Sequence, residues 1–437
     1  MSANEETPAV RKRIAEIHDL VAPGAPQSVA QAHRAHATHR RNMDEDGVVL
    51  YAGTNATRDQ IAGHHDVQLG MRPSMGRPGD KAQAGLESVE VLERFASTAV
   101  AATVSAAHAD VRLPSGTLAN LAVYSGLLDV GATIAVLPAW AGGHVSHHAE
   151  GAAGLRGLKT VELPFDAARQ DVDLERLEEV LAHHQPGLVV VGGCLPLFPY
   201  RLAELAAVVH AAGALLLYDA SHTVGLIAGQ QHQRPFQEGS DVVTFSTYKS
   251  FGGPAGGVVA CVDPEVARRV DKAVYPRLTA NYDAGRLLPL GLAAHHLLDS
   301  GADYARSCVE SARALAVECD RVGLPPLARA RGFTATHVLA IRQADREAAH
   351  AAMTALAGAG IFTSPALACD EDGTTWVLRF GVQELVRRGF APSDMAPLAQ
   401  LVGRVLVDGE PPELVRPAVA AFRRADPTIN NERTGTA

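Results

Sequence analysis

Residues 215–229 read LLLYDASHTVGLIAG, and residues 241–257 read DVVTFSTYKSFGGPAGG. Each segment is a short apolar run that ends abruptly in polar residues. Such runs are typical of buried strands in a parallel sheet, whose carboxyl ends carry the functional side chains. The first run ends at Asp219, and the second leads to Lys249. We therefore expect an aspartate and a lysine to lie close together at one edge of a sheet.

This pair of residues predicts a pyridoxal phosphate enzyme. A carboxylate keeps the pyridine nitrogen protonated, and a lysine amine forms the Schiff base with the cofactor aldehyde. His222 and Ser246 flank the pair as further cofactor contacts, and Gly257 ends a glycine-rich loop that lets backbone approach the cofactor. A lone lysine at a strand end would be a solvated residue or a phosphate ligand, so the prediction depends on both segments.

Composition restricts the classes of function. The chain has 437 residues, 47% hydrophobic and 20% charged, which suits one large domain and a smaller one. A net charge of −9 without a long basic run argues against a nucleic-acid partner. The five cysteines show no CxxC spacing, which favours reduced thiols in the cytoplasm. We see no signal peptide and no apolar stretch of membrane-spanning length, so we predict a cytoplasmic location and no membrane partner.

The pattern along the chain predicts its organisation. Between residues 48 and 275, short apolar runs alternate with helical patterns. This predicts a mostly parallel sheet with helices on both faces. The expected strands span residues 133–137, 188–191, 215–218, 242–245 and 258–262. We divide the chain into a helical arm (1–47), a large domain (48–286), a smaller C-terminal α/β domain (287–425) and a disordered tail (426–437).

Two further motifs suit the charged groups of a cofactor and its substrate. Ser115, Gly116 and Thr117 form a small hydroxyl-bearing turn before an apolar helical run. Such a turn is either a simple N-cap or an anion site, and the downstream lysine and aspartate favour phosphate binding. Arg379 lies on an apolar run, where it is either a structural ion-pair partner or a bidentate ligand for a substrate carboxylate. We favour the carboxylate.

In their order along the chain, these motifs make it resemble the serine hydroxymethyltransferase family of fold type I pyridoxal phosphate enzymes, from about residue 48 to residue 390. The resemblance implies an aspartate aminotransferase-like large domain and a homodimer with a shared active site, to which residues 275–283 of the other subunit contribute. It implies that His144 stacks on the cofactor ring, that His222 contacts its O3′ side and that Arg379 grips the substrate carboxylate. Although His147 and His148 lie nearby, the ligand spacing is poor and we predict no metal.

The chain departs from this family within the pocket. Family members carry a Tyr-Ala-Glu-Gly-Tyr-Pro-Gly-Lys-Arg-Tyr-Tyr-Gly-Gly-type segment, whose glutamate transfers protons in the folate-linked reaction. Met75 stands at that position, and a thioether cannot carry a proton. Tyr248 replaces a family histidine. Gly53 replaces a serine that helps to hold the carboxylate, and we expect this to leave room for a larger Cα substituent or aldehyde. These losses argue against the use of tetrahydrofolate in the reaction.

We therefore predict an enzyme that makes or breaks the Cα–Cβ bond of a β-hydroxy-α-amino acid, as an aldolase or transaldolase that uses an aldehyde and no folate. Retro-aldol cleavage needs an electron sink and a base for the β-hydroxyl. The candidate catalytic residues are Lys249, His144 and Tyr248, and a held water is an alternative base. A folate-dependent hydroxymethyltransferase acting on serine or α-methylserine is the second hypothesis. Transamination or β-elimination is the third, and a cofactor-binding protein without activity is the fourth.

Overall fold

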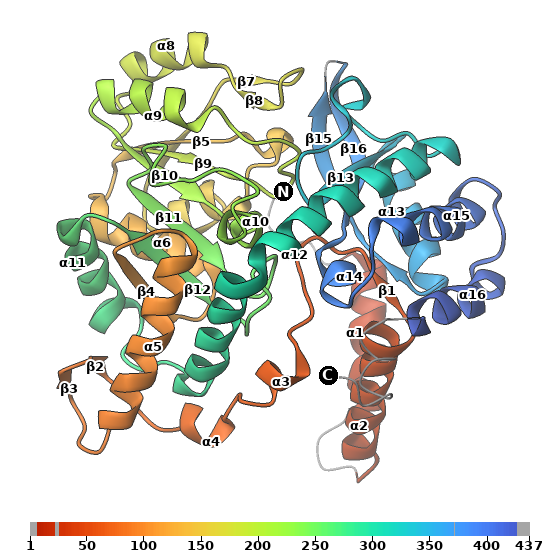
Figure 1. Ribbon diagram of the computed structural model, residues 1–437, viewed down its shortest axis with the longest axis horizontal. Helices are drawn as coiled ribbons and strands as arrows, with labels where there is room; N and C mark the ends of the chain where they lie inside the picture. The colour runs from red at the N-terminus through yellow and green to blue at the C-terminus, as the bar shows by residue number, and fades with distance from the viewer. Residues whose placement is uncertain (1–6, 22–25, 371, 426–437) are drawn as a thin grey trace.

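The computed structural model of the chain describes residues 7–21, 26–370 and 372–425. Its main feature is a seven-stranded sheet with the strand order β4-β12-β11-β10-β9-β5-β6 (Figure 1). Strand β12 runs antiparallel to both β4 and β11, and the remaining neighbours are parallel. The predicted mostly parallel α/β sheet is therefore confirmed. The strands are β4 (His108–Leu113), β5 (Thr133–Val136), β6 (Lys159–Glu162), β9 (Leu188–Val191), β10 (Leu215–Asp219), β11 (Val242–Ser246) and β12 (Gly257–Cys261).

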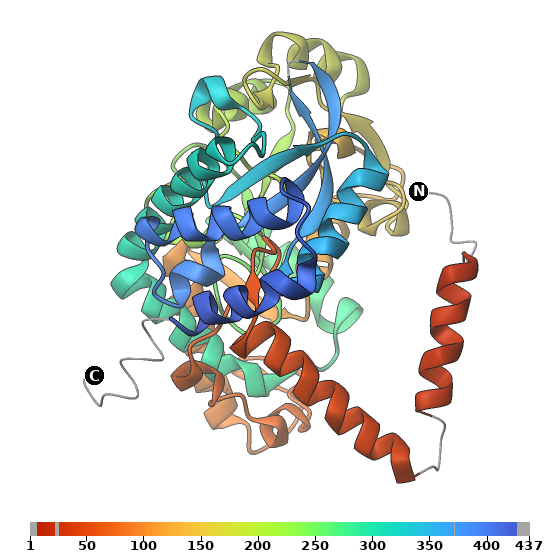
Figure 2. The same cartoon turned by 90° about the vertical axis from the view of Figure 1, so that its right-hand side faces the viewer.

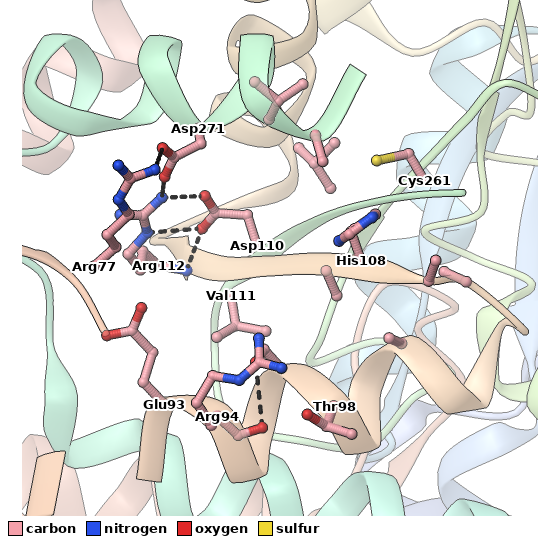
Figure 3. A pocket seen from close by; sticks show the side chains of 18 of the residues that line it. Arg77, Glu93, Arg94, Thr98, His108, Asp110, Val111, Arg112, Cys261 and Asp271 are labelled. Atoms are coloured by element: carbon pink, nitrogen blue, oxygen red, sulfur yellow. Dashed lines mark hydrogen bonds and ion pairs between the residues drawn. The ribbon is translucent and has the colours of Figure 1, made fainter. Parts of the chain in front are cut away.

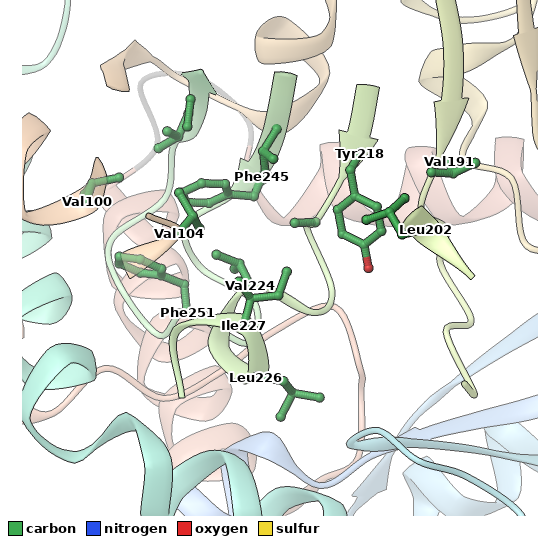
Figure 4. Packing of buried hydrophobic residues seen from close by; sticks show 14 of the residues in the cluster. Val100, Val104, Val191, Leu202, Tyr218, Val224, Leu226, Ile227, Phe245 and Phe251 are labelled. Carbon is green, nitrogen blue, oxygen red and sulfur yellow. The ribbon is translucent and has the colours of Figure 1, made fainter. Parts of the chain in front are cut away.

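Helices cover both faces of this sheet, which explains why its strands are apolar on both sides. Along β10, Leu216 and Tyr218 belong to one core and Leu217 to the other. The first core includes residues of α5, α8, α9, α10 and α12, and the second includes residues of α6 and α11. Figure 4 shows part of the first core, where Phe245 of β11 and Tyr218 of β10 lie among residues of the covering helices. The helices are α5 (Glu87–Thr103), α6 (Gly116–Leu127), α8 (Leu174–His184), α9 (Leu202–Ala211), α10 (Val224–Ala228), α11 (Pro264–Lys272) and α12 (Leu287–Arg321).

Helix α12 joins the large sheet to a further core formed by the C-terminal part of the chain (Figure 1). This part contains a three-stranded antiparallel sheet in the order β13-β16-β15, and β1 pairs with β14 beside it. Val48 and Leu50, which the sequence analysis assigned to the large domain, lie in this C-terminal core. The elements are β1 (Val48–Val49), β13 (Val338–Gln343), α13 (Arg346–Gly358), β14 (Ile361–Phe362), β15 (Ser364–Asp370), β16 (Gly373–Gly381), α14 (Gln383–Arg387), α15 (Met395–Leu406) and α16 (Pro412–Arg424).

The N-terminal segment is helical, and α1 stands apart from the body of the protein (Figure 2). None of the residues of α1 is buried. The predicted domain division stays a prediction, and its tail lies outside the described residues. The remaining elements are α1 (Pro8–Leu20), α2 (Pro26–Arg40), η1 (Arg41–Glu45), α3 (Asp59–Ala62), α4 (Val67–Gly70), β2 (Gly76–Arg77), β3 (Asp80–Lys81), η2 (Ala139–Ala141), η3 (Val145–His147), α7 (Ala152–Leu155), β7 (Phe165–Asp166), β8 (Asp171–Val172), η4 (Ala273–Leu278), η5 (Ala284–Arg286), η6 (Arg329–Arg331) and η7 (Pro392–Asp394).

Candidate active site

A pocket lies beyond the carboxyl ends of the central strands, where ligands bind in open α/β sheets. It brings together nine of the residues predicted from the sequence, while Gly257 and Arg379 lie outside its lining. Four further lining residues, Asn120, Gly193, Cys194 and Ser221, were not predicted. The lining consists of Ser115, Gly116, Thr117, Asn120, His144, Gly193, Cys194, Asp219, Ser221, His222, Ser246, Tyr248 and Lys249.

The amino terminus of α6 forms one end of the pocket. Ser115 is its N-cap, and its Oγ accepts a hydrogen bond from the backbone N–H of Leu118 at 3.3 Å. Gly116 and Thr117 open the helix, where backbone N–H groups lack internal partners and the helix dipole attracts anions. A Cβ on Gly116 would lie 2.5 Å from Ser246 Oγ, and one on Gly257 would lie 2.0 Å from the Ser115 carbonyl oxygen. These two glycines let the strands approach the helix end, so Gly257 shapes this site without lining it.

Asp219 ends β10 at the base of the pocket and is 8% exposed. Its Oδ2 accepts from Asn120 Nδ2 at 3.0 Å and from His147 Nε2 at 3.1 Å, and its Oδ1 accepts from the backbone N–H of Ser221 at 3.0 Å. The Tyr124 hydroxyl lies 2.5 Å from His147 Nδ1, and burial beside Asp219 raises the pKa of Tyr124. The phenol therefore stays protonated beside Nδ1. Because the Asp219 carboxylate can only accept, Nε2 carries the hydrogen that His147 donates to Asp219.

This network keeps the carboxylate charged. Burial by itself would raise the pKa of Asp219, but the hydrogen bonds from His147, Ser221 and Asn120 outweigh it, and the pKa is held below the ordinary value. Thr244 Oγ1 in turn donates to Asn120 Oδ1 at 2.6 Å, which orients the Asn120 amide. The pocket thus presents a fixed anion, which is the group that a protonated pyridine nitrogen requires.

The side chain of Lys249 is partly buried, so its amine is less exposed than the amine of a surface lysine. Its Nζ is 3.2 Å from His222 Nε2. Burial lowers the pKa of Lys249, with Arg379 adding to the effect and with Cys194 and Asp219 opposing it. Burial, and then the charges of Lys249 and Arg379, also lower the pKa of His222 well below its ordinary value, so this imidazole is neutral. A lysine with a lowered pKa is a better nucleophile at neutral pH.

The turn that carries Lys249 is held from a distant part of the chain. Asn55 Nδ2 donates to the carbonyl oxygen of Lys249 and to the hydroxyl of Tyr304, both at 3.0 Å. The Tyr304 hydroxyl donates to the Ser250 carbonyl oxygen at 3.0 Å. These bonds fix the backbone from which the lysine side chain enters the pocket.

His144 has one ring nitrogen that is fully engaged. The backbone N–H of Ser146 donates to His144 Nδ1 at 3.2 Å, and Ser146 Oγ lies 2.7 Å from the same atom. Because a backbone N–H can only donate, Nδ1 is unprotonated and the neutral ring carries its hydrogen on Nε2. Burial lowers the pKa of His144 to about 4, with Asp219 opposing the shift and Lys249 adding to it. A neutral imidazole is suited to stacking on an aromatic ring.

Arg379 lies on β16 and approaches the pocket from the C-terminal core. Its Nη1 donates to the Cys194 carbonyl oxygen at 2.6 Å, and its Nη2 donates to Ser364 Oγ at 3.2 Å. Its Nε is buried without a hydrogen-bond partner among the described residues. The guanidinium is therefore anchored at one side, and it keeps donors for an anionic ligand.

The expectation that Gly53 leaves free space is not met. A Cβ on Gly53 would lie within 3 Å of three atoms of the Tyr51 side chain. The Tyr51 ring, whose centroid is 5.6 Å from Arg379 Cζ, fills the space instead. The expectation rested on the loss of the family's serine at position 53 alone, and it left out the side chain of Tyr51.

Residues 73–85, where the chain departs from the family segment, contain the β2–β3 hairpin, which lies near the amino-terminal end of α5 (Figure 1). The Met75 backbone N–H donates to Gln83 Oε1 at 3.0 Å. Lys81 is buried and forms an ion pair with Glu93 at 2.6 Å, and the Tyr282 hydroxyl donates to the same carboxylate oxygen at 2.6 Å. The hairpin is therefore tied to residues 275–283, and it contributes no residue to the pocket lining in one chain.

These residues fit pyridoxal phosphate. Asp219 would be the anion for the ring nitrogen, and Lys249 would be the amine for the aldehyde. The glycines at 116 and 257 leave a cradle at a helix end, where a phosphate would bind. The buried Nδ1 of His222 has no hydrogen-bond partner among the described residues, so it is available to a ligand.

A second cavity, of about 800 Å³, lies between α5, β4 and α11 and holds none of the predicted site residues (Figure 3). Its Arg112 is paired with Asp110 and Asp271, and Arg77 reaches Asp271 at 3.5 Å. These arginines form ion pairs with carboxylates of the protein. In the first pocket, by contrast, the candidate anion sites have donors left for a ligand.

The described part of the chain contains no group of three or more His, Cys, Asp or Glu arranged to hold a metal ion. None of its helices is both long and apolar enough to cross a membrane.

Comparisons with known proteins identify the family of the chain. The family profile described as Serine hydroxymethyltransferase matches residues 29–402. The chain is 41% identical over 403 residues to an alpha-methylserine aldolase of Variovorax paradoxus, covering 90% of each protein. It is 38% identical over 356 residues to a serine hydroxymethyltransferase of Pyrobaculum arsenaticum, covering 81% of this chain and 83% of the relative.

A solved structure confirms the fold. The L-threonine transaldolase of Pseudomonas fluorescens superposes with a TM-score of 0.83 at 22% identity, covering 96% of this chain and 94% of that one. The predicted fold type I architecture is therefore confirmed, and so is the prediction of a pyridoxal phosphate-dependent enzyme of this family. The chain belongs to the serine hydroxymethyltransferase family of pyridoxal phosphate-dependent enzymes.

Proposed function

We propose that the chain is an aldolase that cleaves and forms the Cα–Cβ bond of an α-methylserine-type β-hydroxy-α-amino acid without tetrahydrofolate. The observation that carries this proposal is that Met75 stands at the start of the β2–β3 hairpin, where the family carries its proton-transferring glutamate. A thioether cannot carry a proton. Asp219, the one carboxylate among the described residues of the pocket lining, is already hydrogen-bonded by three N–H groups and does not replace that glutamate.

The contacts of the site support the following roles. Lys249 would bind the cofactor aldehyde, Asp219 would hold its ring nitrogen, and His144 would stack on the ring. Ser115, Gly116 and Thr117 would hold the phosphate, together with Ser246. The bound cofactor supplies the electron sink for a Cα carbanion. His222 contacts the cofactor beside Lys249, and Arg379 holds the substrate carboxylate through the donors that the protein leaves free.

Tyr248 is the residue that we assign to the proton of the β-hydroxyl. The Ser146 N–H bond leaves the hydrogen of His144 on Nε2, so His144 donates a hydrogen bond into the pocket and is not placed to accept a proton there. Tyr248 lines the pocket and is 37% exposed, so its side chain is open both to a substrate in the pocket and to solvent. A held water beside Tyr248 would complete the path of the proton to solvent.

The substrate class is proposed from the relatives named above. The alpha-methylserine aldolase matches a larger share of the chain, at higher identity, than the serine hydroxymethyltransferase. A folate-dependent hydroxymethyltransferase is the second candidate, and the 38% identity to the Pyrobaculum enzyme favours it.

The test is aldehyde release by cofactor-loaded protein, with the aldehyde identified for each substrate. Serine, α-methylserine, threonine, allo-threonine and phenylserine are offered with and without tetrahydrofolate. We expect α-methylserine to give formaldehyde and alanine at a rate that ignores folate. Lys249→Ala is the inactive control, and Tyr248→Phe should retain cofactor binding and lose most of the cleavage rate. Cleavage that requires folate would refute the aldolase assignment and support the second candidate.

We further propose a cytoplasmic homodimer with an active site shared across the dimer. Residues 275–283 and the β2–β3 hairpin are the segments expected to reach the partner's pocket. The exposed apolar residues Val10, Ile14 and Ile17 on α1 support an arm that packs on a second chain. All five cysteines are free thiols, which suits a reducing compartment. Sedimentation of the holoenzyme measures the oligomeric state, and a monomer would refute the shared site.

A further inference from the structure

Tyr51 and Gly53 form a unit beside the candidate carboxylate site, and the position of the tyrosine ring explains the glycine. A Cβ built on Gly53 would lie 2.7 Å from Cζ and 2.8 Å from the hydroxyl oxygen of Tyr51. Gly53 is not among the glycines with a positive φ, so its backbone suits other residues as well. The tyrosine side chain is therefore what a side chain at position 53 would meet first.

The backbone around this unit is fixed, which leaves the ring as the movable part. Tyr51 forms an antiparallel bridge with Phe380, and its carbonyl oxygen accepts from Gln383 Nε2 at 3.0 Å. The same Gln383 amide donates to the Thr54 carbonyl oxygen at 2.6 Å. Gln383 is fully buried. A larger residue at 53 would therefore displace the Tyr51 ring more readily than the turn.

The ring also reaches the arginine assigned to the substrate carboxylate. Its centroid lies 5.6 Å from Arg379 Cζ, which is a cation–π distance. Tyr51 is 38% exposed, so its side chain is open to a ligand. We propose that Tyr51 is a further substrate-binding residue, whose ring holds the Arg379 guanidinium and whose hydroxyl donates a hydrogen bond to the carboxylate of the amino acid. This inference rests on the proposed function, because it requires an amino-acid substrate at Arg379.

The test measures amino-acid binding rather than turnover. The visible absorbance of the bound cofactor in the holoenzyme is titrated with alanine and glycine, and with propylamine, which has no carboxylate. Tyr51→Phe keeps the ring and removes the hydroxyl. Because a hydrogen bond to a charged acceptor is lost, we expect the Kd for alanine and glycine to rise roughly tenfold or more, with the Kd for propylamine unchanged.

A double-mutant cycle tests the link between the two positions. Gly53→Ala should raise the Kd for alanine in the wild-type background, because the added Cβ displaces the ring. In the Tyr51→Ala background the same change should alter the Kd by less than about twofold, since no ring remains to displace. The cofactor absorbance and the melting temperature of each variant report that folding and loading are intact.

Three results would overturn the inference, and they are distinguishable. If wild-type protein binds alanine and Tyr51→Phe binds it equally well, Tyr51 has no role at the carboxylate and the proposed function is unaffected. If Gly53→Ala raises the Kd for alanine by the same factor in the Tyr51→Ala background as in the wild-type background, the two positions are not coupled. If the wild-type holoenzyme gives no spectral change with either amino acid, both the proposed function and this inference fail.

Discussion

Replacing Asp219 by asparagine removes one charge and keeps the shape of the side chain, so it isolates the contribution of the anion. The Oδ2 position accepts two hydrogen bonds, from Asn120 and His147, and the Oδ1 position accepts one, from the Ser221 backbone. The amide of Asp219→Asn keeps the larger number of bonds when its oxygen occupies the Oδ2 position. Its NH₂ group then faces the Ser221 N–H, and two donors are left opposed.

The magnitude follows from this count. A hydrogen bond to a charged acceptor contributes about 1.5–3 kcal/mol, so we expect Asp219→Asn to lower the free energy of unfolding of the apoprotein by about 2–3 kcal/mol at neutral pH. A group whose folded pKa is depressed stabilises the protein above its unfolded pKa, here 3.8, and loses that contribution as the pH falls through its folded pKa. The difference between wild type and variant should therefore shrink when the pH is lowered below 3.8.

The same substitution weakens the interaction with the ring nitrogen. Losing a charge-assisted bond of that strength in the transition state slows the reaction roughly 10- to 100-fold. Urea unfolding of the apoprotein measures the loss of stability, and the cleavage rate of the cofactor-loaded enzyme measures the loss of activity. Asp241→Asn is the matched control: Asp241 accepts from His210 and from the Leu216 backbone at 3.0 and 2.7 Å, but it is half-buried and outside the pocket lining. If both variants behave alike in both assays, the role of Asp219 is refuted.

Three further predictions concern Lys249, the ion pair between Lys81 and Glu93, and the packing of Phe251. Lys249→Ala should abolish the absorbance of covalently held cofactor, and in wild type the rate of cofactor incorporation should fall as the pH drops through the lowered pKa of this amine; a rate independent of pH would contradict the reasoning. Glu93→Gln leaves the buried Lys81 ammonium without its counter-charge and should cost about 3–5 kcal/mol in urea unfolding, and a loss below 1 kcal/mol would show that the pair is solvated. Phe251→Ala removes a fully buried ring that stacks on Phe245 and should cost about 3–5 kcal/mol; an unchanged melting temperature would disprove this packing.

The sequence predicts the central sheet well because its strands are buried on both faces. Leu215–Asp219 and Val242–Ser246 are mostly apolar and buried along nearly their whole length; the first ends at Asp219, and the second ends three residues before Lys249. The antiparallel direction of β12 was not predicted, because an apolar run carries no information on strand direction. Strand β4 was also missed, since it opens with His108 and contains Asp110 and Arg112, a polar pattern for a strand of this sheet.

The parts of the site that the sequence did not predict depend on contacts between distant positions. Asn120 reaches Asp219 across 99 positions of the chain, and His147 reaches it across 72. Asn120 lies one helical turn after Gly116, on the same face of α6, which is a signal that could have identified it. For Cys194, which lines the pocket and binds Arg379 through its carbonyl oxygen, the local sequence offers no comparable signal.

The contacts of Arg379 also explain why the site depends on both parts of the molecule. The lysine and the aspartate belong to the large sheet, whereas the arginine lies on β16 beside the C-terminal core. Arg379 Nη1 connects the two parts through the Cys194 carbonyl oxygen, and Thr336 Oγ1 connects them through the Pro196 carbonyl oxygen at 2.6 Å. An amino acid bound at both Lys249 and Arg379 would bridge them as well. Substrate binding should therefore stabilise the whole chain, because ligand contacts with both parts are lost when either one unfolds.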